Sequence, residues 1–236
     1  MAPTLSKRAL AAGVHLLTAS GAIWAVLAID AIVDARWQAA FFWMALSLAI
    51  DTLDGSLARL ARVADVFPSF DGTLLDNLVD FLSYVFVPAV FVYRADLLPP
   101  GWALIGVVIV CLSSAYQFSQ GNAKTSDHYF TGFPSYWNIV VFYLFFLDWS
   151  PCLNLGILAL LGIAVFVPIQ YIYPSRTRRN RGLTIVATAL WGLLVVLAIL
   201  QYPDSKAPVL MSMAYLPFYV GLSLYHRISA RSEATT

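Results

Sequence analysis

Long apolar runs dominate the pattern of hydrophobic and polar positions along this chain of 236 residues. Short breaks separate the runs, and Leu98-Pro99-Pro100-Gly101 and Tyr202-Pro203-Asp204 among them have the composition of turns. A helix of about twenty apolar residues is long enough to cross a hydrocarbon layer about 30 Å thick. The pattern predicts eight membrane-spanning helices, over residues 10–33, 37–58, 73–93, 101–119, 134–149, 153–173, 183–201 and 207–225.

The composition agrees with a membrane protein. Hydrophobic residues make up 60% of the chain and charged residues only 11%, whereas about a quarter of a soluble domain is charged. No break is long enough to hold a soluble domain, so we expect one all-α, polytopic helical bundle over residues 1–236. The first run is too long for a signal peptide and is followed by more spans, so we expect it to be retained. The net charge of +1 by itself says nothing about nucleic acid, but no basic tract with interleaved aromatic residues occurs outside the loops, so we expect no nucleic-acid partner.

The basic residues predict how the bundle is oriented. With eight spans, the two termini and the even-numbered loops share one side of the membrane. Of the fourteen Lys and Arg residues, all but Arg36, Arg94 and Lys206 fall on that side. Cytoplasmic loops are enriched in basic residues, so both termini are predicted to be cytoplasmic. The densest group, Arg176, Arg178, Arg179 and Arg181, is interpreted as an anchor that contacts anionic lipid headgroups.

Residues 51–80 place acidic side chains on two helical stripes. Asp51 and Asp54 are three residues apart at the cytoplasmic end of the second predicted span, and Asp76 and Asp80 are four apart in the third. Residues at these spacings share one face of a helix. Two facing helices would therefore bring four carboxylates together near the cytoplasmic boundary of the membrane.

Such a cluster needs compensation, because carboxylates are costly at membrane depth and repel one another. Divalent cations such as Mg²⁺ and Mn²⁺ prefer oxygen ligands and would offset both costs. Gly55 and Gly72 leave room for a ligand to approach, and Arg59 offers a fork suited to phosphate. Together these residues indicate a phosphoryl-transfer site. The solitary aspartates are interpreted instead as solvated caps, namely Asp30, Asp34, Asp65, Asp96 and Asp148.

The same stretch resembles the motif of the CDP-alcohol phosphotransferase family, D-x2-D-G-x2-A-R followed by G-x3-D-x3-D. All eight fixed positions are matched, by Asp51, Asp54, Gly55, Ala58, Arg59, Gly72, Asp76 and Asp80. The twelve residues between Arg59 and Gly72 form a longer spacer than most members have, and this spacer is similar to that of the bacterial phosphatidylcholine synthases. Residues 123–140 also resemble that subfamily, and the wider family's F-x-G-hydrophobic-P pattern is met by Phe130, Gly132, Phe133 and Pro134.

The resemblance implies an enzyme that transfers the phosphatidyl group of CDP-diacylglycerol to choline and releases CMP. It implies that Asp51, Asp54 and Asp76 bind a pair of divalent ions, Mn²⁺ or Mg²⁺, and that Asp80 borders the metals and acts as the general base. It further implies a homodimer in a bacterial inner membrane, surrounded by membrane lipids. The residues expected to lie against the cytidine diphosphate are Asp54, Gly55, Ala58, Arg59 and Gly72.

Choline carries a quaternary ammonium, which is recognised by aromatic faces because it cannot donate a conventional hydrogen bond. We predict choline contacts in the segment that follows Lys124, from Tyr136 and Trp137 foremost and also from Tyr129, Phe133 and Asp127. The alternative is that these aromatic residues form an interfacial belt. His15 and His226 are interpreted as interfacial residues.

Two other functions stay open. A related transferase would use serine, inositol or glycerol phosphate as the acceptor, although a phosphate-bearing acceptor calls for more basic residues near the motif than Arg62 and Lys124. A cation-coupled transporter would use intramembrane carboxylates as an ion path. That function leaves Gly55, Arg59 and Gly72 unexplained, and the chain shows no inverted repeat.

Overall fold

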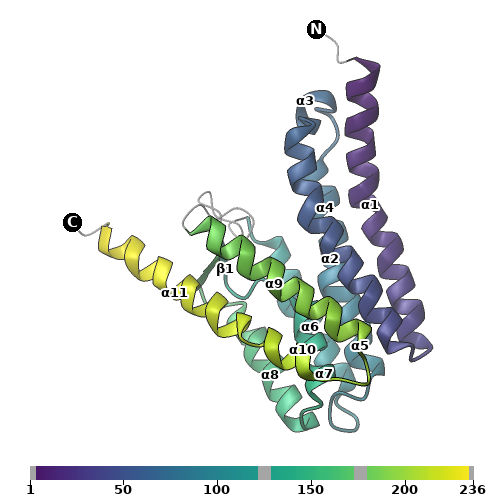
Figure 1. Ribbon diagram of the computed structural model, residues 1–236, viewed down its shortest axis with the longest axis vertical. Coiled ribbons are helices and arrows are strands. Elements are labelled where there is room, and N and C mark those ends of the chain that lie inside the picture. Colours follow the sequence, from purple (N-terminus) through teal and green to yellow (C-terminus); the bar gives the residue numbers. More distant parts are fainter. Residues whose placement is uncertain (1–3, 122–128, 173–179, 234–236) are drawn as a thin grey trace.

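The computed structural model describes residues 4–121, 129–172 and 180–233, and this part of the chain is almost entirely helical (Figure 1). In chain order the elements are α1 (Leu5–Val33), α2 (Trp37–Leu60), α3 (Val63–Val66), α4 (Gly72–Asp80), the π-helix η1 (Phe81–Phe86), α5 (Val87–Arg94), α6 (Ala103–Ser119), β1 (Tyr129–Thr131), α7 (Trp137–Leu147), α8 (Pro151–Ala164), β2 (Gln170–Ile172), α9 (Arg181–Leu200), α10 (Ala207–Ser212) and α11 (Tyr215–Glu233).

The predicted all-α membrane architecture is confirmed. Five helical stretches are long and apolar enough to cross a membrane, Leu5–Val33, Trp37–Leu60, Gly72–Arg94, Arg181–Leu200 and Ala207–Tyr225. The other three predicted runs contain the shorter apolar helices α6, α7 and α8. Many of the leucines and valines on these helices are exposed, as expected of side chains that face lipid.

Several predicted boundaries were wrong. The run over 153–173 ends as a helix at Ala164, because Pro168 cannot continue a helix, and residues Gln170–Ile172 form β2 instead. The run over 134–149 becomes helical only at Trp137, after Pro134 and after Ser135 with its positive φ of 57°. The last run, predicted to end at 225, is divided into α10 and α11, and α11 continues to Glu233.

Helices α1 and α2 form an antiparallel hairpin whose far end, together with α3, projects beyond the other helices (Figure 1). Arg36 lies in the connection between them and pairs with Asp30 at 2.5 Å and with Asp34 at 3.2 Å. These two aspartates therefore stabilise the turn, in line with their interpretation as caps. Because the hairpin packs against α4 and η1, α1 borders the acidic stripes of the motif.

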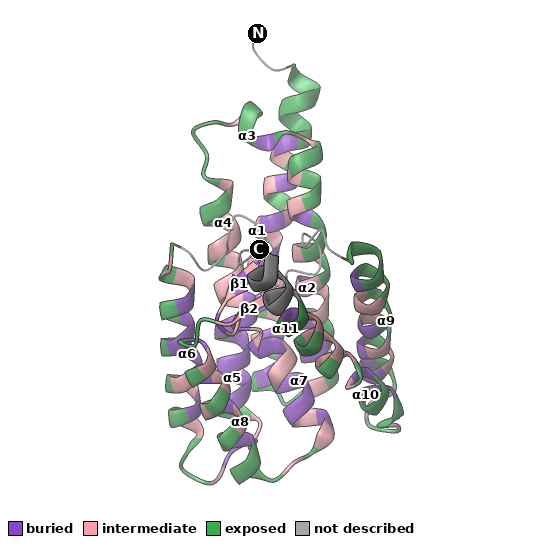
Figure 2. Ribbon diagram, turned by 90° about the vertical axis from the view of Figure 1, so that its left-hand side faces the viewer, coloured by how far each residue is buried: buried purple, intermediate pink, exposed green. Residues whose placement is uncertain are grey.

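An aromatic cluster fixes α2 against α5 and α7. The ring of Phe41 lies 4.9 Å from that of Phe91 and 5.7 Å from that of Phe142, measured between centroids. Figure 2 shows buried positions concentrated on α5 and α7, at the centre of the bundle. Aromatic pairs in tilted and edge-to-face arrangements pack closely and specifically. The cluster therefore sets where α2 stands relative to the chain that carries η1.

The C-terminal helices are joined to this core by buried polar contacts. The Trp191 indole of α9 donates a hydrogen bond to the Tyr143 hydroxyl of α7 at 2.9 Å. The same hydroxyl lies 3.0 Å from Ser212 Oγ of α10. Hydrogen bonds between helices are a common means of association in membranes, where the hydrophobic effect between helices is absent.

Candidate active site

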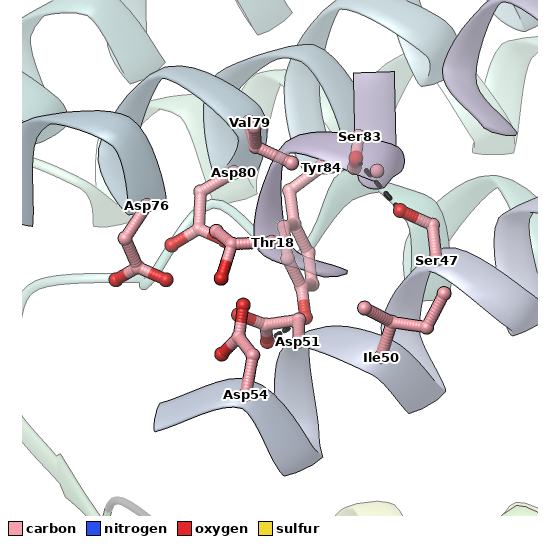
Figure 3. A pocket seen from close by; sticks show the side chains of 11 residues that line it. Thr18, Ser47, Ile50, Asp51, Asp54, Asp76, Val79, Asp80, Ser83 and Tyr84 are labelled. Atoms are coloured by element: carbon pink, nitrogen blue, oxygen red, sulfur yellow. Dashed lines mark hydrogen bonds between the residues drawn. The ribbon is translucent and has the colours of Figure 1, made fainter. Parts of the chain in front are cut away.

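The structure brings the two acidic stripes face to face. Asp51 and Asp54 on α2 and Asp76 and Asp80 on α4 point toward one another across a small pocket (Figure 3). Carboxylate oxygens of Asp51, Asp76 and Asp80 all lie within 4.8 Å of one another. This arrangement suits a cation with several oxygen ligands.

The start of α4 is set by a side-chain cap. Asp71 Oδ1 accepts a hydrogen bond from the backbone N–H of Leu74 at 2.9 Å, so the helix begins at Gly72. An acidic N-cap satisfies a free N–H group of the first turn. Because the first residue of the helix is fixed, Asp76 and Asp80 lie about one turn apart on the face toward α2.

A wider helical turn follows Asp80 directly. Residues Phe81–Phe86 are π-helical, and Ser83 and Tyr84 within them face α2 (Figure 3). The Ser47 hydroxyl of α2 donates to Ser83 Oγ at 2.8 Å. Such π turns frequently lie at functional sites, because they re-aim the side chains beside them.

Tyr84 holds the first aspartate of the motif. Its hydroxyl donates a hydrogen bond of 2.6 Å to Asp51 Oδ2, and the residue is only 6% exposed. Tyr84 was not predicted as a site residue from the sequence. Its position four residues after Asp80 continues the stripe of Gly72 and Asp76, and extending that stripe by one step would have found it.

The third wall of the pocket belongs to α1. Thr18 faces Asp54, which is only 4% exposed (Figure 3). A Cβ atom added at Gly21 would clash with Val79, so this glycine permits the close approach of α1 and α4. Thr18 was also missed, although a polar residue inside an apolar span is a usable signal. The full lining of the pocket is Thr18, Gly21, Ser47, Ile50, Asp51, Asp54, Asp76, Val79, Asp80, Ser83 and Tyr84.

The chemistry of this donor set fits a divalent metal. Four carboxylates from two helices supply oxygen ligands only, and three of them already lie at mutual distances that one ion spans. Their mutual repulsion in a partly buried site would be relieved by positive charge. Asp51, Asp76 and Asp80 are the residues best placed to hold such an ion, with Asp54 beside them.

Of the residues expected to contact the cytidine diphosphate, only some lie at the pocket. Asp54 lines the pocket, and Gly72 lies at the first position of α4. Ala58 packs against the small apolar cluster of Ala11, Val14 and Val63. Arg59 is exposed, and its guanidinium donates to Ser56 Oγ at 3.0 Å on its own helix.

The segment predicted to contact choline reaches the edge of this site through Tyr136. The Tyr136 ring centroid lies 5.8 Å from that of Tyr84 and 6.0 Å from that of Phe130. Gly132 fixes the segment against the end of α8, because its φ is +79° and an added Cβ would clash with the Val165 carbonyl oxygen. This explains why the chain has glycine there.

The other predicted choline contacts have different surroundings. Trp137 has no exposed surface, and its indole donates to Ser114 Oγ at 2.7 Å. Phe133 packs edge-on against Trp137, with their centroids 5.2 Å apart. Tyr129 lies in β1, where it pairs with Ile172. Asp127 lies outside the described residues.

Comparison with known proteins agrees with this geometry. The family model for CDP-alcohol phosphatidyltransferase matches residues 14–172, which contain both acidic stripes. A phosphatidylcholine synthase of Pseudomonas aeruginosa is 39% identical over 93% of this chain and 92% of its own length. One from Legionella pneumophila is 39% identical over 94% and 90%, and one from Borreliella burgdorferi is 35% identical over 89% and 90%.

The family match spans both helices that carry the carboxylates, and the relatives are similar along nearly the full length of the chain. This chain therefore belongs to the CDP-alcohol phosphatidyltransferase family.

Proposed function

We propose that this chain is a phosphatidylcholine synthase, which transfers the phosphatidyl group of CDP-diacylglycerol to choline and releases CMP. The observation that carries the proposal is the convergence of four motif aspartates in one pocket. The relatives named phosphatidylcholine synthase support choline as the acceptor, since their similarity extends over about nine tenths of the chain.

Asp51, Asp54 and Asp76 would hold the divalent metal, for which we propose two ions, Mn²⁺ or Mg²⁺, and Asp80 would border the same ions. When bound, these ions would neutralise the charge of the donor's pyrophosphate and of the departing CMP. Tyr84 fixes the carboxylate of Asp51 through its hydrogen bond and so keeps one ligand oriented. The hydroxyl of Thr18 stands beside Asp54 on the opposite wall.

Asp80 is our proposed general base. Its carboxylate would take the proton of the choline hydroxyl while the choline oxygen forms a bond to the β-phosphorus of CDP-diacylglycerol. The bond from that phosphorus to the bridging oxygen breaks, and CMP leaves with the electron pair. A positioned base typically contributes about 10²- to 10⁴-fold to such a step.

The donor's cytidine diphosphate would extend from the carboxylates along the facing surfaces of α2 and α4. Gly55, Ala58 and Gly72 lie on these helices beyond the aspartates and present little side-chain bulk. Arg59 would reach the phosphates by exchanging its hydrogen bond to Ser56 for one to the ligand.

For choline, the contacts of the described residues favour Tyr136. It has partial exposure, and its ring lies next to Tyr84, whose hydroxyl binds Asp51. Tyr129 and Phe133 lie earlier in the same segment and would complete an aromatic surface. Trp137 is fully buried, so we do not propose it as a choline contact.

We further propose that residues 1–236 form one domain in a bacterial inner membrane, with both termini cytoplasmic, and that the enzyme is a homodimer. The hydrogen bonds from α9 and α10 to α7 support the first point, because they join the helices beyond residue 172 to the family core.

The first prediction concerns the acceptor. Purified protein with CDP-diacylglycerol and Mn²⁺ or Mg²⁺ should release CMP when choline is added, because choline supplies the attacking hydroxyl. Serine, inositol and glycerol phosphate should give little release under the same conditions. CMP release is measured by chromatography. Release with another alcohol and none with choline would assign a different transferase, and no release with any alcohol would contradict the transferase itself.

The second prediction concerns the aspartates. Replacing Asp51, Asp54 or Asp76 singly by Asn should abolish CMP release and weaken metal binding, because each change removes a charged ligand. Asp80→Asn should also cut turnover strongly, yet it should leave the metal-dependent binding of CDP-diacylglycerol in place.

The matched control is Asp65→Asn, an exposed aspartate on the neighbouring helix α3, which should keep full activity. Full turnover in any of the three ligand variants would refute the metal assignment. Loss of donor binding in Asp80→Asn, in parallel with activity, would make Asp80 chiefly a ligand.

The third prediction concerns Tyr84. Tyr84→Phe keeps the ring and removes the hydrogen bond to Asp51. Loss of a residue that orients a metal ligand usually lowers metal affinity about 10- to 100-fold. The metal concentration for half-maximal activity should therefore rise by about the same factor. Tyr143→Phe removes a buried hydroxyl with two partners remote from the pocket. It should lower thermal stability and leave metal activation unchanged. Equal metal activation in Tyr84→Phe and the wild type would contradict the role of Tyr84.

The fourth prediction concerns choline recognition. Tyr136→Ala should raise the choline KM severalfold to about thirtyfold, because a cation–π contact is worth about 0.5 to 2 kcal/mol, while the KM for CDP-diacylglycerol changes little. The control is Tyr116→Ala, an exposed tyrosine that packs on Phe166. A choline KM that stays at its wild-type value in Tyr136→Ala would place the ammonium elsewhere.

A further inference from the structure

His15 lies on α1, three residues before Thr18 and on the same face of the helix. In the structure its ring packs against two phenylalanine side chains. Its ring centroid lies 4.3 Å from that of Phe70 and 6.1 Å from that of Phe67. Both phenylalanines belong to the long spacer between the two halves of the motif.

The imidazole occupies the space that a motif glycine leaves open. A Cβ atom added at Gly72 would lie 3.0 Å from His15 Cε1 and 3.7 Å from His15 Nδ1. The first of these distances is tighter than an ordinary van der Waals contact, so a larger residue at position 72 would require the imidazole to shift. His15 therefore stands at the N-terminus of α4, nearly one helical turn, or about 4.5 Å, along α1 from the pocket wall at Thr18.

One nitrogen of this ring has no partner among the described residues. His15 Nε2 is buried and makes no hydrogen bond within residues 4–121, 129–172 and 180–233. Buried polar atoms in proteins are nearly always paired, so an orphan among the described residues points to a bound ligand as its partner. An imidazole nitrogen either donates or accepts, and it suits the hydroxyl, carbonyl and ring-nitrogen groups of a nucleoside.

We propose that His15 is a donor-binding residue whose Nε2 hydrogen-bonds the cytidine moiety of CDP-diacylglycerol and of the product CMP. This inference rests on the proposed function, because it takes the diphosphate to lie at the four aspartates. The nucleoside is the next part of the donor, and His15 lies one turn beyond the carboxylate pocket, against Gly72.

Phe70 is the side chain that must move to admit the nucleoside. Its ring is the nearer of the two phenylalanine rings to the imidazole, it is 49% exposed, and it lies in the irregular segment between α3 and α4. Displacement of this ring opens a path to Nε2, and the ring then provides an apolar face for the pyrimidine.

Direct binding of CMP to the metal-loaded protein in nanodiscs tests the proposal without relying on turnover. His15→Phe keeps an aromatic ring against Phe70 and removes the nitrogen, so it should weaken CMP binding about 3- to 10-fold, the worth of one hydrogen bond. In His15→Gln the amide nitrogen can stand near the position of Nε2, so this variant should bind more tightly than His15→Phe. The choline KM should stay unchanged in both, and Leu16→Ala, on the neighbouring exposed position, should behave as the wild type.

A merely structural role predicts the reverse order, with the aromatic His15→Phe retaining more affinity than His15→Gln. That order, or CMP affinity within twofold of the wild type in His15→Phe, would overturn the proposal. The unsubstituted protein gives a second test if the variants fold poorly. With ¹⁵N-labelled histidine, saturating CMP should shift the His15 imidazole resonances, and unshifted resonances would also overturn it. Failure of the proposed function is distinguishable, because it appears as absent CMP release with choline.

Discussion

Mutual repulsion of carboxylates in a partly buried site is the constraint on which the rest of this structure depends. Asp51, Asp76 and Asp80 hold their oxygens within 4.8 Å of one another, and Asp54 is almost fully buried beside them. A helix bundle in lipid does not keep such a group together without a compensating partner, because each charge is costly at membrane depth. The surrounding helices therefore pack so that these carboxylates stay together and can bind a positively charged ligand.

Contacts outside the motif position the helices that carry the aspartates. The aromatic cluster around Phe41 sets α2 against α5, and the Ser47 to Ser83 hydrogen bond links α2 to the π-helical turn. Tyr84 then fixes Asp51 at 2.6 Å. On the other side, the glycine at position 21 lets α1 approach α4, which brings Thr18 into the pocket. Motif residues supply the ligands, and neighbouring helices determine their geometry.

The sequence predicted what depends on local pattern. Each of the eight predicted apolar runs contains a helix of the structure, and the spacing of the aspartates predicted which faces of the helices meet. It could not locate the end of α8 well, because the apolar run continues past Pro168 into a strand whose partner lies some forty residues earlier. Tyr84 was missed for a related reason, since its role depends on a hydrogen bond to Asp51 on another helix. Trp137 looked like a ligand contact because aromatic residues surround it, and only tertiary packing places it wholly in the core.

The location of bound manganese tests the central claim most directly. Crystals of the protein grown with Mn²⁺ should show anomalous scattering peaks in contact with carboxylate oxygens of Asp51, Asp76 and Asp80, and these peaks should vanish in Asp76→Asn. Manganese bound at another place, with none at these aspartates, would contradict the account.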